Sequence, residues 1–503
     1  MPEAIQRQKK LGGRTAIVGT GSRGQLYLRG VVDRAHIPGN AVVALCDSNE
    51  GRVKLYNRLL EELGQSVSSS VVREFEVLST YTNNDSQKAV EYGEQDFEKM
   101  LDDEHVEVLV VTTVDATHDR YIIPALKRGI KVLTEKPMTT DIEKCKAILR
   151  TVKDTNNHFT VTFNYRFNPV HEKVQNLIAE GKIGKVFSVH FEWLLNTVHG
   201  ADVSTTPSQQ DSQVSNHPFS YSVSRAESFE ANFRRWHRSK DNSGGLMVHK
   251  SGHHFDLVNW WVNSSPKQVV GMGKTAFYGK KNGEEHGWAK DYKRAYGSEE
   301  AKKDPFALDM NADETLKEMY VDNEQYDGYI RDSNVFGDDI AIEDDMSVLV
   351  RYQNDVIMTY HLTAYSPWEG YRVMFNGSHG RLELEVVEST HNSLEEPALV
   401  GPGSIHGTRP MANAGHAKLS LHPLWQKPVD IPVYYDHAGH GGGDKRLLSS
   451  IFGPLKGDEP EREGASSMAC TEIDGANALA IGLAANESFV TGKMIDVEEM
   501  LCI

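Results

Sequence analysis

The pattern of hydrophobic and polar positions changes once along the chain, near Asn164. Before that point, short continuous apolar runs alternate with amphipathic stretches of helical period. Strands buried on both faces of a parallel sheet give such runs, and crossover helices occupy the stretches between them. We therefore expect a doubly wound α/β domain, with Asp141 as the N-cap of its last helix. Its expected strands are residues 15–19, 41–47, 106–113, 131–135 and 158–164, and its expected helices are 50–64, 121–129 and 141–154.

The chain after Asn164 has a different texture. Residues 168–184 predict a helix closed by glycine, and the later apolar segments alternate with a period of two. That alternation is typical of an antiparallel sheet with one buried face. We expect an α+β domain with a largely antiparallel open sheet, and a homo-oligomer in which a partner subunit covers the open face. The expected strands are residues 185–193, 346–352, 356–364, 371–377 and 381–388.

The change of pattern divides the chain into two domains, 1–163 and 164–503. Three segments of the second domain look like insertions. Residues 203–230 are rich in Ser and Gln and predict a loop, whereas residues 279–340 are acidic and aromatic and are suited to a partial cover over a pocket. Residues 389–430 are rich in Gly, Pro and His and carry no clear period.

Composition narrows the class of protein. The 503 residues suffice for two sizeable cores, and 54 Lys and Arg against 71 Asp and Glu give a net charge of −17, the wrong sign for an extended nucleic-acid surface. The four cysteines are far apart and form no C-x-x-C pair, so neither a disulfide framework nor a thiolate zinc site is indicated. The sequence lacks a secretory apolar core and a membrane-spanning run, so we expect a cytoplasmic protein with no membrane or nucleic-acid partner.

A glycine motif follows the first expected strand. Gly19-x-Gly21-x-x-Gly24 sits between a strand and a helix, the context in which such glycines let backbone approach a pyrophosphate at a helix N-terminus. The next strand ends at Asp47, which is placed to accept hydrogen bonds from an adenosine ribose. The alternative is a glycine-rich turn in an ordinary β-α unit. The motif therefore predicts an NAD(P)-binding Rossmann domain over residues 1–163.

The choice between NAD and NADP depends on charges around the ribose. Asp47 favours NAD because its carboxylate would repel a 2′-phosphate. Arg23 and Arg52 lie near enough in sequence to neutralise that phosphate, so NADP remains an alternative. Ser22 lies inside the glycine motif and is expected to contact the cofactor with the other residues of this region.

A second motif carries a family resemblance. Residues 108–141 run through strand, loop, helix and strand into Glu135-Lys136-Pro137, and here the sequence resembles the Gfo/Idh/MocA oxidoreductases. The likeness is close over the first domain and present in outline over the second. It implies that Lys136 lies beside both the nicotinamide and the substrate, with Glu135 next to it. The alternative for Lys136 is a surface lysine before a turn.

The loop before this motif departs from the family pattern. Thr112 and Thr113 occupy the place where the family has a Thr-Pro pair followed by a histidine, but Val114 stands where the pattern would lead us to expect proline. The resemblance implies that the threonines and His118 contact the cofactor. His118 has a second interpretation, as the cap of a helix beginning near Arg120.

The stretch GGLMVHKSGHHFD resembles the family signature G-G-x-x-x-D-x-G-x-H-x-x-D. Gly244 and Gly245 match, His249 occupies the Asp position, Ser251 replaces a glycine, and His253 and Asp256 match. If the stretch is one helix, His249, His253 and Asp256 share a face at spacings i, i+4 and i+7. Lys250 and His254 then form the adjacent stripe.

Hydride transfer from a secondary alcohol requires a base for the hydroxyl proton, and neutral imidazole suits that role. We expect His253 to be the leading base, with His249 and Lys136 positioning hydroxyls and sharing the proton. Lys250 and Asp256 are expected at the substrate, with Asp256 orienting the helix or an imidazole. Two alternatives stay open. One is a metal bound by His249, His253 and Asp256, which the neighbouring Lys250 disfavours, so we expect no metal; the other is a solvent-facing His cluster.

Further residues are expected at the domain junction. Asn164, Tyr165 and Arg166 lie in a segment that resembles the family's N-x-R-x-x-P, and are expected to face the cleft, although a core role suits Tyr165 equally. Arg235 and His237 suit a polyhydroxylated or acidic ligand, with a solvated basic edge as the alternative. Near the C-terminus, His440 is within possible reach of the pocket and Asp444 is an expected N-cap.

Together these features predict an NAD(P)-dependent oxidoreductase that acts on a secondary hydroxyl or carbonyl of a small-molecule polyol, sugar, cyclitol or glycoside. Two alternatives share the cofactor. The first is an NAD-dependent glycosidase that uses transient oxidation and elimination, as some relatives do. The second is a non-catalytic NAD(P)-binding sensor or regulatory subunit.

Overall fold

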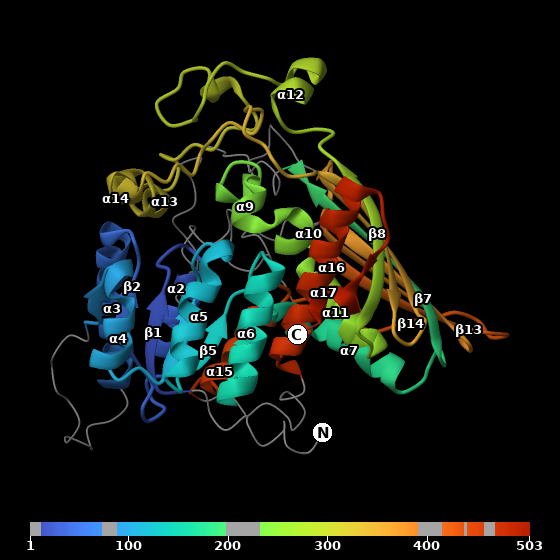
Figure 1. Ribbon diagram of the computed structural model, residues 1–503, viewed down its shortest axis with the longest axis horizontal. Helices are drawn as coiled ribbons and strands as arrows, with labels where there is room; N and C mark the ends of the chain where they lie inside the picture. Colours follow the sequence, from blue (N-terminus) through green and yellow to red (C-terminus); the bar gives the residue numbers. More distant parts are fainter. Residues whose placement is uncertain are drawn as a thin grey trace.

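The apolar runs of the first domain form a parallel sheet in the computed structural model (Figure 1). Among the described residues this sheet has six strands in the order β3-β2-β1-β4-β5-β6, and every pairing is parallel. The strand order reverses between β1 and β4, which leaves a crevice outside their carboxyl ends. The doubly wound expectation is confirmed. The strands are β1 (Arg14–Val18), β2 (Ala41–Cys46), β3 (Val90–Tyr92), β4 (Val108–Val111), β5 (Lys131–Thr134) and β6 (Phe159–Val161).

Helices cover both faces of this sheet because alternate strand residues point to opposite sides. Ala16 and Val18 belong to the same core as α4 (Phe97–Asp103), α5 (His118–Lys127) and α6 (Ile142–Thr155). Ile17 belongs to the core formed with α2 (Gly24–Val32) and α3 (Glu50–Val72). Asp141 caps α6 as predicted, since its side chain accepts a hydrogen bond from the Lys144 backbone N–H.

The structure describes residues 12–72, 88–197, 232–390, 415–436, 440–456 and 468–502. The expected insertion at residues 203–230 lies outside these ranges, as does much of the segment 389–430. Within the described ranges, no helix is both long and apolar enough to span a lipid bilayer.

The second sheet is larger and mostly antiparallel, as expected. The described residues place nine strands in the order β14-β13-β12-β11-β7-β10-β9-β8-β15, and only β7 and β10 pair in parallel. The strands are β7 (Val186–Asn196), β8 (Pro266–Lys274), β9 (Asp345–Tyr352), β10 (Ile357–Ser366), β11 (Glu369–Gly377), β12 (Gly380–Ser389), β13 (His416–Pro423), β14 (Val429–Ile431) and β15 (Ile495–Asp496).

One face of the second sheet is covered and the other is open. Figure 1 shows the covering helices between this sheet and the first domain. Buried and more exposed residues alternate along β9 and β10, so the uncovered face carries the polar positions expected from the period-two pattern. The covering helices are α7 (Pro169–Ala179), α10 (Gly245–His249), α11 (Gly252–Val262), α16 (Glu472–Thr491) and α17 (Val497–Leu501).

Two later segments return to the first domain. Residues 279–340 carry α12 (Lys280–His286), α13 (Glu314–Met319) and α14 (Glu324–Asp327), and Figure 1 shows α13 and α14 standing above α3. Helix α15 (Gly443–Phe452) contributes Leu447 and Ile451 to the core that contains α2. Helix α13 lies against α3 and α15 lies against α2, and Asp444 at the start of α15 pairs with Arg23 of the glycine loop.

Candidate active site

A cleft of about 340 Å³ opens at the carboxyl ends of the parallel strands and is bounded by both domains. It brings together most residues predicted from the sequence. Gly24, His118, Arg166 and Asp256 are not among its lining residues. The predicted residues that line it are Gly19, Gly21, Ser22, Arg23, Asp47, Arg52, Thr112, Thr113, Glu135, Lys136, Asn164, Tyr165, Arg235, His237, His249, Lys250, His253 and His440.

The glycine motif has the geometry that a dinucleotide needs. Gly19 has a φ of +92°, and a Cβ there would lie 2.5 Å from the Thr112 carbonyl carbon. The space above Gly21 is open, because the nearest atom to a Cβ at that position is the Tyr320 hydroxyl at 3.8 Å. Close packing below the loop and open space above it fit the approach of a pyrophosphate, with α2 beginning immediately after the loop.

The charges at the ribose end favour NAD. The Asp47 carboxylate accepts hydrogen bonds from the Thr20 N–H at 2.6 Å and the Asn49 N–H at 2.8 Å. The Arg52 Nη2 lies 3.2 Å from Asp47 and 2.6 Å from Asp327, so two carboxylates already engage this guanidinium. Arg23 likewise contacts two carboxylates, those of Glu135 and Asp444, and NADP remains the alternative.

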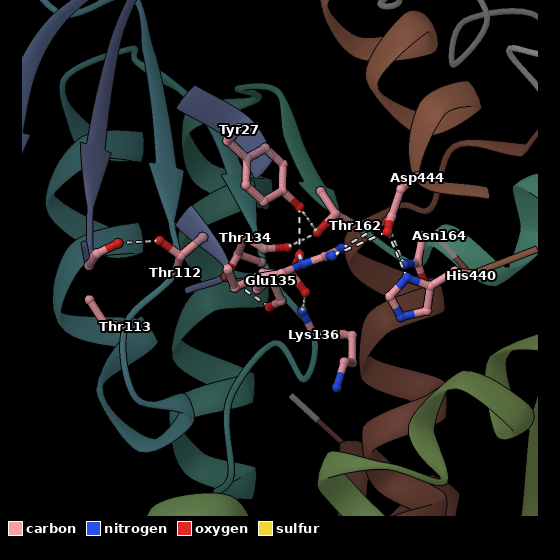
Figure 2. A network of polar contacts seen from close by, with 12 residues as sticks. Tyr27, Thr112, Thr113, Thr134, Glu135, Lys136, Thr162, Asn164, His440 and Asp444 are labelled. Atoms are coloured by element: carbon pink, nitrogen blue, oxygen red, sulfur yellow. Dashed lines mark hydrogen bonds and ion pairs between the residues drawn. The ribbon is translucent and has the colours of Figure 1, made fainter. Parts of the chain in front are cut away.

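Glu135 and Asp444 belong to a polar network that joins three parts of the chain (Figure 2), and Arg23 connects these two carboxylates. Its Nε donates to Glu135 at 2.6 Å, and its Nη2 lies 3.1 Å from Asp444. The Tyr27 hydroxyl donates to the same Glu135 oxygen at 2.7 Å. Glu135 therefore holds the glycine loop against the turn that carries Lys136.

Asp444 is not the N-cap predicted for its helix. Gly442 is the N-cap of α15, and the Asp444 carboxylate turns instead toward Asn164 Nδ2 at 2.7 Å and His440 Nδ1 at 2.6 Å. Burial opposes ionisation of Asp444, but Arg23 and His440 outweigh burial and hold its pKa well below the usual range. Ion pairing across the domain junction has displaced the local capping contact.

Lys136 connects the two lobes of the cleft. It follows β5, its side chain is almost fully buried, and its Nζ donates to the His249 carbonyl oxygen at 2.9 Å. His249 is the last residue of α10, on the other lobe. The amine of Lys136 and the helix that carries His249 are therefore in direct contact.

His249 has an acidic partner that sequence reasoning missed. Its Nδ1 donates to the Asp115 Oδ2 at 2.5 Å, and both side chains are at most 8% exposed. Asp115 lies in the loop after β4, next to Val114, at the point where the chain departs from the family's Thr-Pro pattern. A carboxylate bound to Nδ1 fixes the tautomer in which Nε2 is the basic nitrogen.

His253 has a different environment. Its ring stacks on Tyr165 with centroids 4.4 Å apart, and burial lowers its pKa well below the usual value, with further lowering by Lys136, His440 and Lys250. Within the described residues its Nδ1 has no hydrogen-bond partner. The imidazolium form of His253 is therefore strongly disfavoured.

The expected single helix through these histidines is broken. Helix α10 ends at His249 and α11 begins at Gly252, because the Ser251 N–H donates to the carbonyl oxygen of Leu246, five residues back, at 2.8 Å. That wide turn interrupts the regular i to i−4 ladder. His249 and His253 both line the cleft whereas Asp256 does not, so the three residues do not form the single row that one continuous helix predicts.

Arg166 and Asp256 bind each other instead of facing the cleft. Arg166 donates to both Asp256 oxygens, at 2.8 and 2.6 Å, and the two side chains are 3% and 0% exposed. Arg166 also lies 3.1 Å from Asp474 at the start of α16. Neither residue lines the cleft, and the two form a buried ion pair in which each charge is the partner of the other.

No metal-binding cluster is found among the residues that the structure describes, counting groups of three or more His, Cys, Asp or Glu. The proposed ligands diverge: His249 faces Asp115, whereas Asp256 faces Arg166. Two of the three candidate ligands are thus engaged with other side chains.

His118 supports the site from beneath. It is fully buried, its Nδ1 lies 3.0 Å from the Pro137 carbonyl oxygen, and its Nε2 lies 3.2 Å from the Thr113 carbonyl oxygen. Helix α5 begins at His118 itself, and no side-chain cap is present there. His118 therefore connects the threonine loop to the turn that carries Lys136, and neither of its two predicted roles describes this contact.

An aromatic and basic wall bounds the cleft beside His249. Trp236 stacks on His237 with centroids 3.6 Å apart, and the His237 ring lies 4.1 Å from the His249 ring. Lys250 and Arg235 line the same cleft. Such a combination of rings and cations suits a ligand with several hydroxyl groups.

The sequence matches two family models. One, described as an oxidoreductase family with an NAD-binding Rossmann fold, covers residues 13–163. The other, the C-terminal alpha/beta domain of the same family, covers residues 175–401. The chain belongs to the Gfo/Idh/MocA family. It is therefore an NAD(P)-dependent oxidoreductase, and the family resemblance found in the motifs is confirmed.

Individual relatives agree with this assignment. The chain is 31% identical to the putative oxidoreductase YteT of Bacillus subtilis over 418 residues, which cover 82% of this chain and 86% of the relative. It is 27% identical to scyllo-inositol 2-dehydrogenase (NAD(+)) of B. subtilis over 172 residues, covering 34% and 42%. The fold resembles aldose-aldose oxidoreductase from Caulobacter crescentus, with a TM-score of 0.52, 14% identity and coverage of 97% and 100%.

This member of the Gfo/Idh/MocA family adds residues to the cleft that no motif indicated. Besides Asp115, the segment 279–340 supplies Tyr320, Tyr329 and Arg331, and β7 supplies Trp193. The sequence held one indication that such a residue as Asp115 exists. His249 stands where the family signature has Asp, and an imidazole that acts as a base needs a group that orients it. The acidic and aromatic composition of 279–340 indicated a cover but not which side chains would face inward.

Buried histidines make the stability of the protein depend on pH. Burial lowers the pKa of His118, His171, His253 and His254, for His171 to about 4. The unfolded chain binds protons at these histidines below about pH 6.5 while the folded protein does not, so unfolding takes up protons and acid favours it. The free energy of unfolding should fall between pH 7 and pH 5, by up to about 1.4 kcal/mol per pH unit for each histidine.

Urea denaturation at pH 7, 6 and 5 measures this change. Asp256 acts in the opposite direction, because burial raises its pKa to about 6 against the pull of Arg166. Burial raises the pKa of Asp33 and Asp344 as well, so three carboxyl groups oppose four histidines, and we expect the net fall to persist. A free energy of unfolding that stays constant or rises toward pH 5 would contradict the assignment of neutral buried histidines.

Proposed function

We propose that the protein oxidises a secondary hydroxyl, or reduces the corresponding carbonyl, of a sugar, cyclitol or glycoside by hydride transfer with NAD. One observation carries the proposal: Lys136 and the Asp115–His249 pair meet in the same cleft as the glycine loop. The wall of Trp236, His237 and Arg235 beside them suits a polyhydroxylated ligand. The similarity to scyllo-inositol 2-dehydrogenase points to the same class of substrate.

In the proposed mechanism His249 is the base. Bound NAD supplies the hydride acceptor. As hydride leaves the carbinol carbon, the hydroxyl proton passes to His249 Nε2, and the Asp115 carboxylate at Nδ1 stabilises the imidazolium that forms. The sequence favoured His253 instead. Burial and the surrounding cations oppose protonation of His253, so we assign it the role of a neutral wall and hydrogen-bonding group.

Lys136 is proposed to hold the reacting oxygen. Its ammonium is fixed by the His249 carbonyl oxygen, which places a positive charge next to the proposed base. A cation at this point orients the hydroxyl and stabilises negative charge that develops on its oxygen. In the reverse direction the same contact polarises the carbonyl for hydride addition.

The experiment is a panel of sugars, inositols and glycosides, each mixed with enzyme and NAD while NADH is followed by absorbance. Formation of NADH with one or more free sugars or inositols is the expected result. Cleavage of a glycoside without net NADH would replace this proposal with the redox-assisted glycosidase. Binding of NAD with no conversion of any compound would favour a sensor.

We also propose that a second copy of the chain covers the open face of the nine-stranded sheet. Met272, Leu349 and Ile357 lie on neighbouring strands of that face and are 82%, 47% and 49% exposed. Exposed apolar side chains grouped on a sheet face favour association.

A further inference from the structure

The segment 314–331 reaches from the second domain onto the glycine loop. The Tyr320 hydroxyl lies 3.2 Å from the Ser22 backbone nitrogen and 2.8 Å from Ser22 Oγ. It is also the atom nearest to the open position above Gly21. In a dinucleotide-binding loop, that backbone N–H and that open position face the pyrophosphate. The Tyr320 hydroxyl therefore occupies the place that a pyrophosphate oxygen would take, and a bound pyrophosphate would replace Ser22 as its hydrogen-bond partner.

Positive charge surrounds Tyr320. The Arg331 guanidinium lies 4.1 Å from the centroid of the Tyr320 ring, and Arg331 is 1% exposed. Arg235 lines the same cleft from another part of the chain. Burial would raise the pKa of Tyr320, but Arg331, Arg235 and other nearby donors outweigh burial and lower it. The space between the glycine loop and the segment 314–331 thus favours an anion.

The segment is anchored to the first domain beside this space. Asp327 binds Arg52 at 2.6 Å, and the Asn49 Nδ2 donates to the Asn323 carbonyl oxygen at 2.9 Å. Arg58 forms a further ion pair with Glu318. These anchors run along α3, next to Asp47 at the ribose end, and Figure 1 shows α13 and α14 standing above α3. A dinucleotide in the cleft would lie between the glycine loop and this segment.

We propose that residues 314–331 form a clasp over the cofactor, in which Tyr320 and Arg331 bind the pyrophosphate from the side opposite the glycine loop. The anchors to α3 must separate before the dinucleotide leaves, so cofactor exchange is slow. Binding of NAD alone underlies this inference, and the identity of the substrate does not enter it. Charge-assisted contacts of this kind change affinity by about tenfold to a hundredfold.

The test compares dissociation constants of the full-length, cofactor-free protein for NAD, ADP-ribose and adenosine by titration calorimetry. Arg331→Met and Tyr320→Phe should weaken binding of NAD and ADP-ribose, by about tenfold to a hundredfold for Arg331→Met. Binding of adenosine, which has no phosphate, should not change. Equal affinity of both variants and the wild-type protein for NAD and ADP-ribose would overturn the proposal, as would a loss for adenosine as large as that for ADP-ribose.

A second measurement tests the anchors. Asp327→Asn removes the carboxylate that binds Arg52, and it should accelerate NADH release, followed by stopped-flow fluorescence, by about tenfold. Asp322→Asn is the matched control, because Asp322 lies in the same segment but pairs with the partly exposed Lys317. An unchanged release rate in Asp327→Asn, or equal acceleration in both variants, would show that the segment does not retain the cofactor. Neither assay requires substrate, so failure of the proposed function cannot be mistaken for failure of the clasp.

Discussion

Replacement of Lys136 by methionine is expected to lower kcat by about 10²-fold to 10⁴-fold while the dissociation constant for NAD changes little. Methionine keeps most of the buried aliphatic volume of the lysine side chain but has no ammonium. The hydrogen bond to the His249 carbonyl oxygen and the positive charge beside the proposed base are both lost. The loss should fall on kcat because this charge acts on the reacting oxygen.

Steady-state kinetics on the substrate found in the panel, together with titration of NAD, measures both quantities. Lys146→Met is the matched control, because Lys146 lies in the same domain on α6 and pairs with Glu143 away from the cleft. Its activity should equal that of the wild-type protein. If Lys136→Met retains full activity, the proposed site is wrong.

The second large effect is expected at Asp115. Asp115→Asn should lower kcat by about 10²-fold to 10³-fold, because asparagine can neither stabilise the imidazolium of His249 nor reliably select its tautomer. Asp119→Asn is the control: Asp119 lies in the next turn of the same segment but pairs with Lys144. That variant should keep its activity.

A double-mutant cycle identifies the base. If Asp115 acts through His249, Asp115→Asn should add little to the loss already caused by His249→Gln, so the two effects should be strongly non-additive. His253→Gln should cost less activity than His249→Gln. A larger loss in His253→Gln, or full additivity of Asp115→Asn and His249→Gln, would return the role of base to His253.

The sequence predicted some of the residues on which these predictions depend, but not all of the contacts between them. The glycine motif, Asp47 and Lys136 were found because each follows a strand of the parallel sheet, and the carboxyl ends of such strands meet at one edge. The partner of His249 was not found, since Asp115 lies 134 residues away along the chain. No local pattern links two such positions before the domains pack.

Other differences have the same origin. The sequence placed Arg166 and Asp256 at the substrate as separate groups, whereas packing of α11 against the domain junction brings them into one buried ion pair. The long helix α16 was not predicted at all. It carries buried residues along most of its length, because it lies against β8, α11 and α6, and a helix covered on several sides shows no amphipathic period.

Two kinds of information are therefore separable in this protein. Periodicity and the strand-loop-helix motifs were sufficient to predict the fold class, the cofactor and the family. These features depend on residues that are close together in the sequence, because local backbone geometry and the burial of alternate residues determine them. The assignment of the proposed base, the ion pairs of Arg23 and Arg52, and the approach of Tyr320 to the glycine loop depended on packing between distant segments. In each case a polar or charged group near the cleft forms a hydrogen bond or an ion pair with a residue that is distant in the sequence. Tertiary packing determines that partner, because it brings the two side chains within hydrogen-bonding distance.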